Sequence, residues 1–195
     1  MQSKNTYRPR KNDTMSIGSD FITDYEENRE DIERWFSIKC PQRYRRFSQL
    51  LESNEEEPTW NKVKDLYRYD KRLIFNSFRY ISFLEEYLRA MVVRSEGNTE
   101  ESYGRWQEMY LSDLIKPVSV SMGSEYGKNL SKVKELRNCI SHNRVVLESD
   151  FKGIFDSLSR CLPDTYREGF VKDITTAAKG LEVNEKWIWN PSTIM

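Results

Sequence analysis

The segment Leu136–Asn143, LRNCISHN, holds the only histidine among the 195 residues of the chain. Arg137 stands five residues before His142, and Asn138 follows the arginine directly. If the segment is an α-helix, each residue turns by about 100°, so Asn138 and His142 share one line of its surface and Arg137 lies on the adjacent line. An imidazole that titrates near neutral pH, a fixed cation and an amide on one helix face suit the handling of a phosphate ester.

The same helical geometry places more residues around this polar face. Ser141 and Arg144 continue the line of Arg137, and an apolar line beside them is formed by Val133, Leu136 and Ile140. A plainer interpretation stays open at this point. In it, His142 packs near a helix end and bonds a carbonyl group, while Arg137 lies on the surface.

Length and composition restrict the class of protein. A chain of 195 residues is long enough to bury a core as one domain without disulfides or metals. Cys40, Cys139 and Cys161 lack metal-ligand spacing, so we expect no zinc site and no other cofactor. No stretch approaches about eighteen consecutive apolar residues, and no signal-peptide pattern is present. We therefore expect a soluble, cytoplasmic protein without a membrane partner.

The formal net charge is zero, which gives no overall attraction to nucleic acid. Any binding of RNA must then depend on local patches. One such patch precedes residue 50, where Arg43, Arg45 and Arg46 surround Tyr44 and stand near Phe47. These side chains could hold an RNA backbone and stack a base. The alternative is an ordinary solvated helix face.

The elements that position these residues are predicted to be helices. Apolar residues recur at helical spacing in most of the chain from residue 20 onward. The first expected helix covers 20–40, as one or two pieces, and a second begins after Pro41. A long helix is expected over 59–94, either continuous or broken near Tyr69 and Asp70, and a shorter one over 99–115 that ends at Pro117. The last three are expected over 130–147, with Ser131 as a candidate cap, over 149–162 and over 164–181. Loops are expected at ESNEEEP and at SVSMGSEYGKN.

No β-hairpin signal and no internal repeat appears, so we predict an all-α helical bundle. Residues 1–19 are polar and are expected to form a disordered arm. Residues 20–181 are expected to form a single helical domain. The tail, 182–195, alternates Trp187 and Trp189 with polar residues and is expected to lie extended across the bundle. The tryptophans are expected to be core or interface anchors: Trp35, Trp60, Trp106, Trp187 and Trp189.

The motif segment resembles the signature of the HEPN superfamily, helical domains whose Arg-(polar)-x-x-x-His motif typically cleaves RNA. Two upstream elements are similar to the Abi-like branch (AbiD/AbiF type) of abortive infection proteins. They are DLYRYDKRL, which contains Asp70, and LEEYLR, which contains Glu85 and Arg89. Order and spacing fit over Val63–Val146. The resemblance implies a HEPN-like core at about 59–162, with an additional N-terminal helical segment.

The resemblance also implies roles for single residues. Arg137, Asn138 and His142 match the catalytic positions, and Glu85, Arg89, Ser141 and Arg144 are expected to support them. Two positions depart from the family pattern. Arg144 stands where the HEPN toxins of paired nucleotidyltransferase systems carry tyrosine, so modification of such a tyrosine is not expected. Ser141 replaces an alanine that is frequent in the Abi branch.

Two upstream residues have more than one interpretation. Glu85 and Arg89 lie four residues apart, which favours a simple salt bridge along one helix. Alternatively, Glu85 reaches the motif helix and fixes Arg137 or His142. Asp70 is interpreted as a cap or a bundle pair and not as a catalytic residue.

The implied activity is metal-independent cleavage of RNA through the ribose 2′-hydroxyl, in phage defence or toxin-like growth inhibition. One histidine does not readily serve as both acid and base in a single turnover, so we expect a homodimer with a composite active site. The other expected partners are the RNA substrate and an antitoxin or regulatory protein. Two alternatives remain. One is a HEPN fold that binds RNA or protein without cleavage, and the other is a helical scaffold with a coincidental motif.

Overall fold

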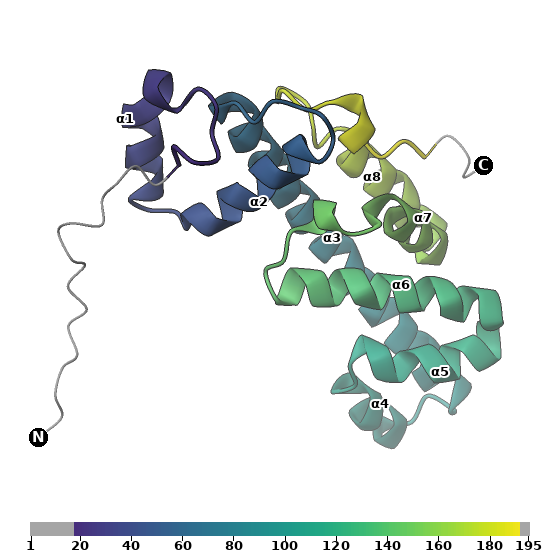
Figure 1. The fold of residues 1–195 in the computed structure, drawn as a ribbon. Coiled ribbons are helices and arrows are strands. Elements are labelled where there is room, and N and C mark those ends of the chain that lie inside the picture. The colour runs from purple at the N-terminus through teal and green to yellow at the C-terminus, as the bar shows by residue number, and fades with distance from the viewer. Residues whose placement is uncertain (1–17, 192–195) are drawn as a thin grey trace, which may run out of the picture. The chain divides into compact units, whose positions relative to one another are not determined.

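A computed structural model describes residues 18–191, and these form helices joined by short connections, with no strand among them (Figure 1). The predicted all-α fold class is confirmed. None of the helices in this part of the chain is long and apolar enough to cross a membrane. The expected arm, 1–19, lies outside the described residues except for its last two positions.

The described residues divide into two compact units, one up to Tyr67 and one from Arg68. The division falls inside α3 (Trp60–Ser95). The expected single domain over 20–181 and the HEPN-like core at 59–162 therefore stay predictions. The candidate residues of the motif and of its two upstream elements all lie in the second unit: Asp70, Glu85, Arg89, Arg137, Asn138 and His142.

The first unit contains α1 (Tyr25–Phe36), α2 (Pro41–Glu52) and the first turns of α3. Pro41 occupies the first position of α2, where the missing N–H would have no helical partner in any case. An aromatic cluster joins the three helices through edge and stacking contacts of Trp35, Phe36, Tyr44, Trp60 and Tyr67. The ring of Trp60 is fully buried among these residues.

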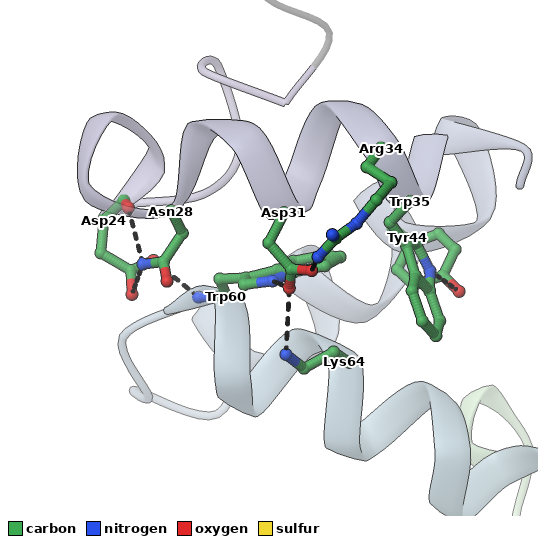
Figure 2. A network of polar contacts seen from close by, with 8 residues as sticks. All are labelled: Asp24, Asn28, Asp31, Arg34, Trp35, Tyr44, Trp60 and Lys64. Carbon is green, nitrogen blue, oxygen red and sulfur yellow. Dashed lines mark hydrogen bonds and ion pairs between the residues drawn. The ribbon is translucent and has the colours of Figure 1, made fainter. Parts of the chain in front are cut away.

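Two aspartates of the first unit tie the N-terminal helices to the start of α3 (Figure 2). Asp24 accepts the backbone N–H of Trp60 at 2.6 Å, which satisfies one of the free donors at that helix start. Asp31 accepts the indole N–H of Trp60 at 2.7 Å and a guanidinium N–H of Arg34 at 2.8 Å. These two bonds, the indole first, lower the pKa of Asp31 to about 2. The carboxylate is therefore charged in the folded protein at neutral pH.

The long helix continues without interruption through Tyr69 and Asp70, so the break allowed there is absent. Both side chains are fully buried. The phenol of Tyr69 donates to the carbonyl of Trp187 at 3.1 Å, and Asp70 also has tertiary partners. Polar residues in the middle of the helix are therefore satisfied by contacts with other elements, and the helix does not need to break around them.

The region after α3 differs from the expectation. In place of one helix over 99–115 and a loop, there are α4 (Glu100–Gln107) and α5 (Leu111–Met122), and α6 (Ser124–Ser141) begins six residues before the expected start. Pro117 lies inside α5. Its lost hydrogen bond is tolerated because Leu111, Leu114 and Val118 are buried on one side of that helix.

Glycines explain the tight connection between α5 and α6. Gly123 separates the two helices with φ of 94°, a conformation that other residues rarely adopt. One turn later, a Cβ atom at Gly127 would overlap with the hydroxyl group of Ser119. The two helices can therefore approach closely. Ser131, which was expected to cap this helix, lies inside α6, and its hydroxyl donates to the Gly127 carbonyl.

In the second unit α6 lies between α5 and α7 (Phe151–Cys161), as Figure 1 shows. The short helix η1 (Val146–Glu148) joins α6 to α7, and α8 (Asp164–Thr175) and η2 (Glu185–Trp187) follow. Trp189 contacts Phe155 and Phe170, and its indole donates to Asp156 at 2.8 Å. Trp187 and Trp189 are both buried, so the described part of the tail belongs to this core.

Candidate active site

The motif occupies the C-terminal end of α6. The helix ends at Ser141, and His142 is its C-cap residue. Asn143 adopts φ of 51° and donates to the carbonyl of Ile140 at 3.0 Å, while the N–H of Arg144 donates to the carbonyl of Cys139 at 2.9 Å. These bonds form a Schellman motif, in which asparagine is the second choice after glycine. His142 therefore stands at the C-terminal end of α6.

The prediction that Arg144 continues the helical line of Arg137 is wrong. The left-handed conformation of Asn143 turns the chain away from the helix axis before Arg144. Ser141 does lie one turn after Arg137, but its hydroxyl donates to the Arg137 carbonyl at 2.9 Å. Ser141 thus supports the helix backbone.

The side chains of His142 and Asn138 are both exposed at this helix end. The N–H of His142 donates to the Asn138 carbonyl at 3.0 Å, so the two residues stand one turn apart on the same side. No residue in 18–191 makes a hydrogen bond or an ion pair with the imidazole or with the Asn138 amide group. The imidazole therefore does not bond a carbonyl group, and both side chains are accessible to a ligand.

Arg137 is the fixed cation of the site. Its Nε lies 3.6 Å from Oε1 of Glu85 on α3, and its guanidinium lies 6.0 Å from the centre of the Tyr110 ring. One third of the Arg137 side chain remains exposed, 33%. The guanidinium is therefore oriented by two contacts and still presents part of its surface to solvent.

Glu85 connects Arg137 with a second arginine. Its Oε2 lies 3.3 Å from Nη2 of Arg89, and the same nitrogen donates to the carbonyl of Met109 at 2.8 Å. The carboxylate therefore bridges along α3 and also reaches α6, while its supporting role at the site stays a prediction. The three charged groups carry one net positive charge, which favours an anion beside Arg137.

Met109 and Tyr110 were not predicted from the sequence as parts of the site. They form the connection between α4 and α5, which the expected single helix over 99–115 concealed. A sequence signal for this connection is Asp113, three residues after Tyr110. Its carboxylate accepts the Tyr110 N–H at 3.0 Å, as the third helical residue often does at the start of a helix.

The segment that follows the motif is held by α3. Asp70 is fully buried, and its Oδ1 accepts the N–H groups of Val146 at 2.7 Å and Leu147 at 3.3 Å. Next to it, Lys71 donates to the side-chain oxygen of Asn143 at 3.0 Å. The interpretation of Asp70 as a cap is confirmed. The upstream element DLYRYDKRL thus fixes the chain directly after His142.

The basic cluster of α2, in the first unit, is arranged differently from the RNA-binding prediction. Tyr44 and Phe47 are buried, and the Tyr44 ring stacks on Tyr67 with 4.6 Å between the ring centres. Arg45 forms an ion pair with Asp20. Arg43 and Arg46 also have partners within the chain. The prediction that Tyr44 stacks on a base is wrong, because its ring is part of the aromatic core.

The cysteines do not gather with other potential metal ligands. Within residues 18–191, no group of three or more His, Cys, Asp or Glu side chains could hold a metal ion. Cys40 is exposed, Cys139 is half-buried and Cys161 is buried. Burial raises the pKa of the Cys161 thiol to about 12, which makes it a poor nucleophile.

Comparisons of the chain with protein-family models, with curated proteins and with solved structures gave no significant match. The candidate site therefore stands on its geometry and on the resemblance of its three sequence elements. Those elements are the ones that meet in space. Glu85 from LEEYLR contacts Arg137, and Asp70 and Lys71 from DLYRYDKRL contact the residues after His142.

Proposed function

We propose that the protein is a metal-independent endoribonuclease of the HEPN/Abi type. The observation that carries the proposal is the presence of two suitable groups near one helix end. His142 offers an exposed imidazole without a hydrogen-bond partner among the described residues, and Arg137, five residues earlier, offers a guanidinium that Glu85 orients.

The proposed reaction needs one proton removed, one proton delivered and charge stabilised. The ribose 2′-hydroxyl loses its proton as its oxygen attacks the adjacent phosphorus, and the bond from phosphorus to the 5′ oxygen breaks. The 5′ oxygen gains a proton, which leaves a 2′,3′-cyclic phosphate and a 5′-hydroxyl. His142 supplies one of the two proton transfers. Arg137 binds phosphoryl oxygens with its planar fork, and Asn138 orients the phosphate or the imidazole.

The second proton transfer is assigned to His142 of a second copy of the chain. A twofold axis next to α6 would bring two imidazoles and two guanidiniums into one cleft. Exposed apolar residues on α3 support this assignment. Phe75 and Phe78, which are 72% and 55% exposed, lie on α3 between Lys71 and Glu85, the two α3 residues that contact the motif end.

The biological role is proposed from the resemblance. An RNA-cleaving protein of the Abi type would act in phage defence or inhibit growth as a toxin does. An activity of this kind needs restraint, so an antitoxin or a regulatory protein is the expected further partner.

The proposal is tested by incubating the purified protein with total RNA in EDTA. We expect cleavage by the native protein and a loss of at least about 100-fold in His142→Ala and in Arg137→Ala. Lys132→Ala is the matched control, because Lys132 is an exposed cation elsewhere on α6. Cleavage that survives both site substitutions would overturn the assigned site. Retained RNA binding without cleavage in the native protein would favour the binding-domain alternative.

A further inference from the structure

A pocket of about 500 Å³ lies between the end of α3 and α4. It is lined by Glu86, Arg89, Ala90, Val93, Arg94, Asn98, Tyr103 and Gln107, so two arginines outweigh the single carboxylate of Glu86. A volume of this size is typical of sites for small organic ligands. None of these residues belongs to the Arg137 and His142 pair, so the pocket is a separate feature of the second unit.

Arg89 connects the pocket to the candidate active site. Its Nη2 is bonded to Glu85 and to the Met109 carbonyl, while its side chain also forms part of the pocket wall. The Nε of Arg89 is buried and has no hydrogen-bond partner among the described residues. A ligand in the pocket would therefore contact Arg89, which is paired with Glu85, and Glu85 in turn is paired with Arg137.

The chemistry of the wall fits a flat heterocycle with polar edges. The Tyr103 ring is 59% exposed, although an aromatic ring is normally buried, and Arg94 adds a planar cation. Asn98 and Gln107 supply amide groups that both donate and accept. Aromatic rings and guanidinium planes stack on unpaired bases, and amides bond the base edges.

We propose that this pocket binds an unpaired base of the RNA near the phosphate that Arg137 holds. The inference rests on the proposed function and adds to it a subsite for one unpaired base. A base in a duplex is stacked and paired, so it cannot enter the pocket. Cleavage is then directed to loops and single strands.

The test measures binding of a fluorescent single-stranded RNA that carries 2′-fluoro groups and therefore cannot be cleaved by 2′-hydroxyl attack. We expect Tyr103→Ala to weaken binding about tenfold, because one stacking contact is lost. Tyr103→Phe keeps the ring and is expected to bind like the native protein. Gln107→Ala is a second pocket variant, expected to weaken binding less. A matched duplex is expected to bind weakly and equally to all four proteins.

The outcomes separate this inference from the proposed function. If Tyr103→Ala binds the single-stranded RNA as tightly as the native protein does, the assignment of the pocket to a base is overturned. The same holds if the native protein does not bind single-stranded RNA. If His142-dependent cleavage is observed in either case, the proposed function stands without the pocket. If Tyr103→Ala loses binding but the native protein cleaves no RNA, the pocket stands and the proposed function fails.

Discussion

The carboxylate of Glu85 lies between the guanidinium groups of Arg89 and Arg137. An arginine side chain loses about 2 kcal/mol of rotamer entropy when it is fixed, so an unrestrained Arg137 would lose this entropy on binding substrate. The ion pair with Glu85 already restrains Arg137 in the folded protein, so less entropy is lost on binding. It is therefore a positioning residue in the proposed reaction, although it does not touch the reacting atoms.

We predict that Glu85→Gln lowers kcat for a defined RNA by about tenfold, because the neutral amide orients Arg137 less strongly. The melting temperature should change little, since Arg89 keeps its bond to the Met109 carbonyl. Glu135→Gln, which changes an exposed carboxylate on α6, is the matched control. An unchanged kcat in Glu85→Gln would contradict the positioning role.

Asp31 gives a prediction for the dependence of stability on pH. Its pKa is lowered from 3.8 to about 2 in the folded state, so its contribution is present above pH 4 and disappears as the pH falls through 2. The carboxylate is partly exposed, and screening reduces the contribution to about 1 kcal/mol. Asp31→Asn should therefore lower the free energy of unfolding at pH 7, and the difference should shrink toward pH 2.

Urea unfolding at pH 7, 4 and 3 measures this effect. Glu30→Gln is the control, because Glu30 is the neighbouring exposed carboxylate on α1 and has no partner among the described residues. A destabilisation by Asp31→Asn that is the same at all three pH values would rule out the assigned charge effect.

Among the elements, α6 was predicted better in its buried face than in its two ends. Of the predicted apolar line, Val133 and Leu136 are fully buried and Ile140 is half-buried, whereas Asn138 is exposed. The end of the helix was placed too late because Asn143 was not recognised as a left-handed cap. Periodicity reports which face is buried, whereas helix ends depend on single backbone conformations.

The continuation of α5 past Pro117 to Met122 could not be predicted for a related reason. Proline normally marks a helix end, but Pro117 is tolerated in α5 because tertiary burial outweighs one lost hydrogen bond. The buried position of Tyr44 was missed in the same way. Its neighbours in sequence are arginines, and its contacts are with Trp35 and Tyr67 on other helices.

The short helix η1 depends on one buried carboxylate of α3. We predict that Asp70→Ala lowers the free energy of unfolding by about 3 kcal/mol, because it leaves the N–H groups of Val146 and Leu147 without their acceptor. Asp70→Asn keeps an acceptor oxygen and should cost about 1 kcal/mol. Denaturant unfolding measures both, and equal stability of Asp70→Ala and the native protein would contradict the anchoring role.

At the scale of the whole molecule, the proposed composite site requires two copies of the chain. We predict that the native protein is a dimer at micromolar concentration and that the double substitution Phe75→Asp with Phe78→Asp makes it monomeric and inactive. Val120→Asp is the matched control, because Val120 is 84% exposed on α5. Light scattering after gel filtration gives the mass. A native monomer that cleaves RNA would contradict the composite site.

In the proposed reaction, His142 and Arg137 cleave RNA through its own 2′-hydroxyl. The most direct test is the chemical identity of the ends that the native protein produces in EDTA. We predict 2′,3′-cyclic phosphate and 5′-hydroxyl ends, which are absent from the same reaction with His142→Ala. Ends that carry a 3′-hydroxyl and a 5′-phosphate, or the same cyclic products in equal yield from His142→Ala, would contradict the claim.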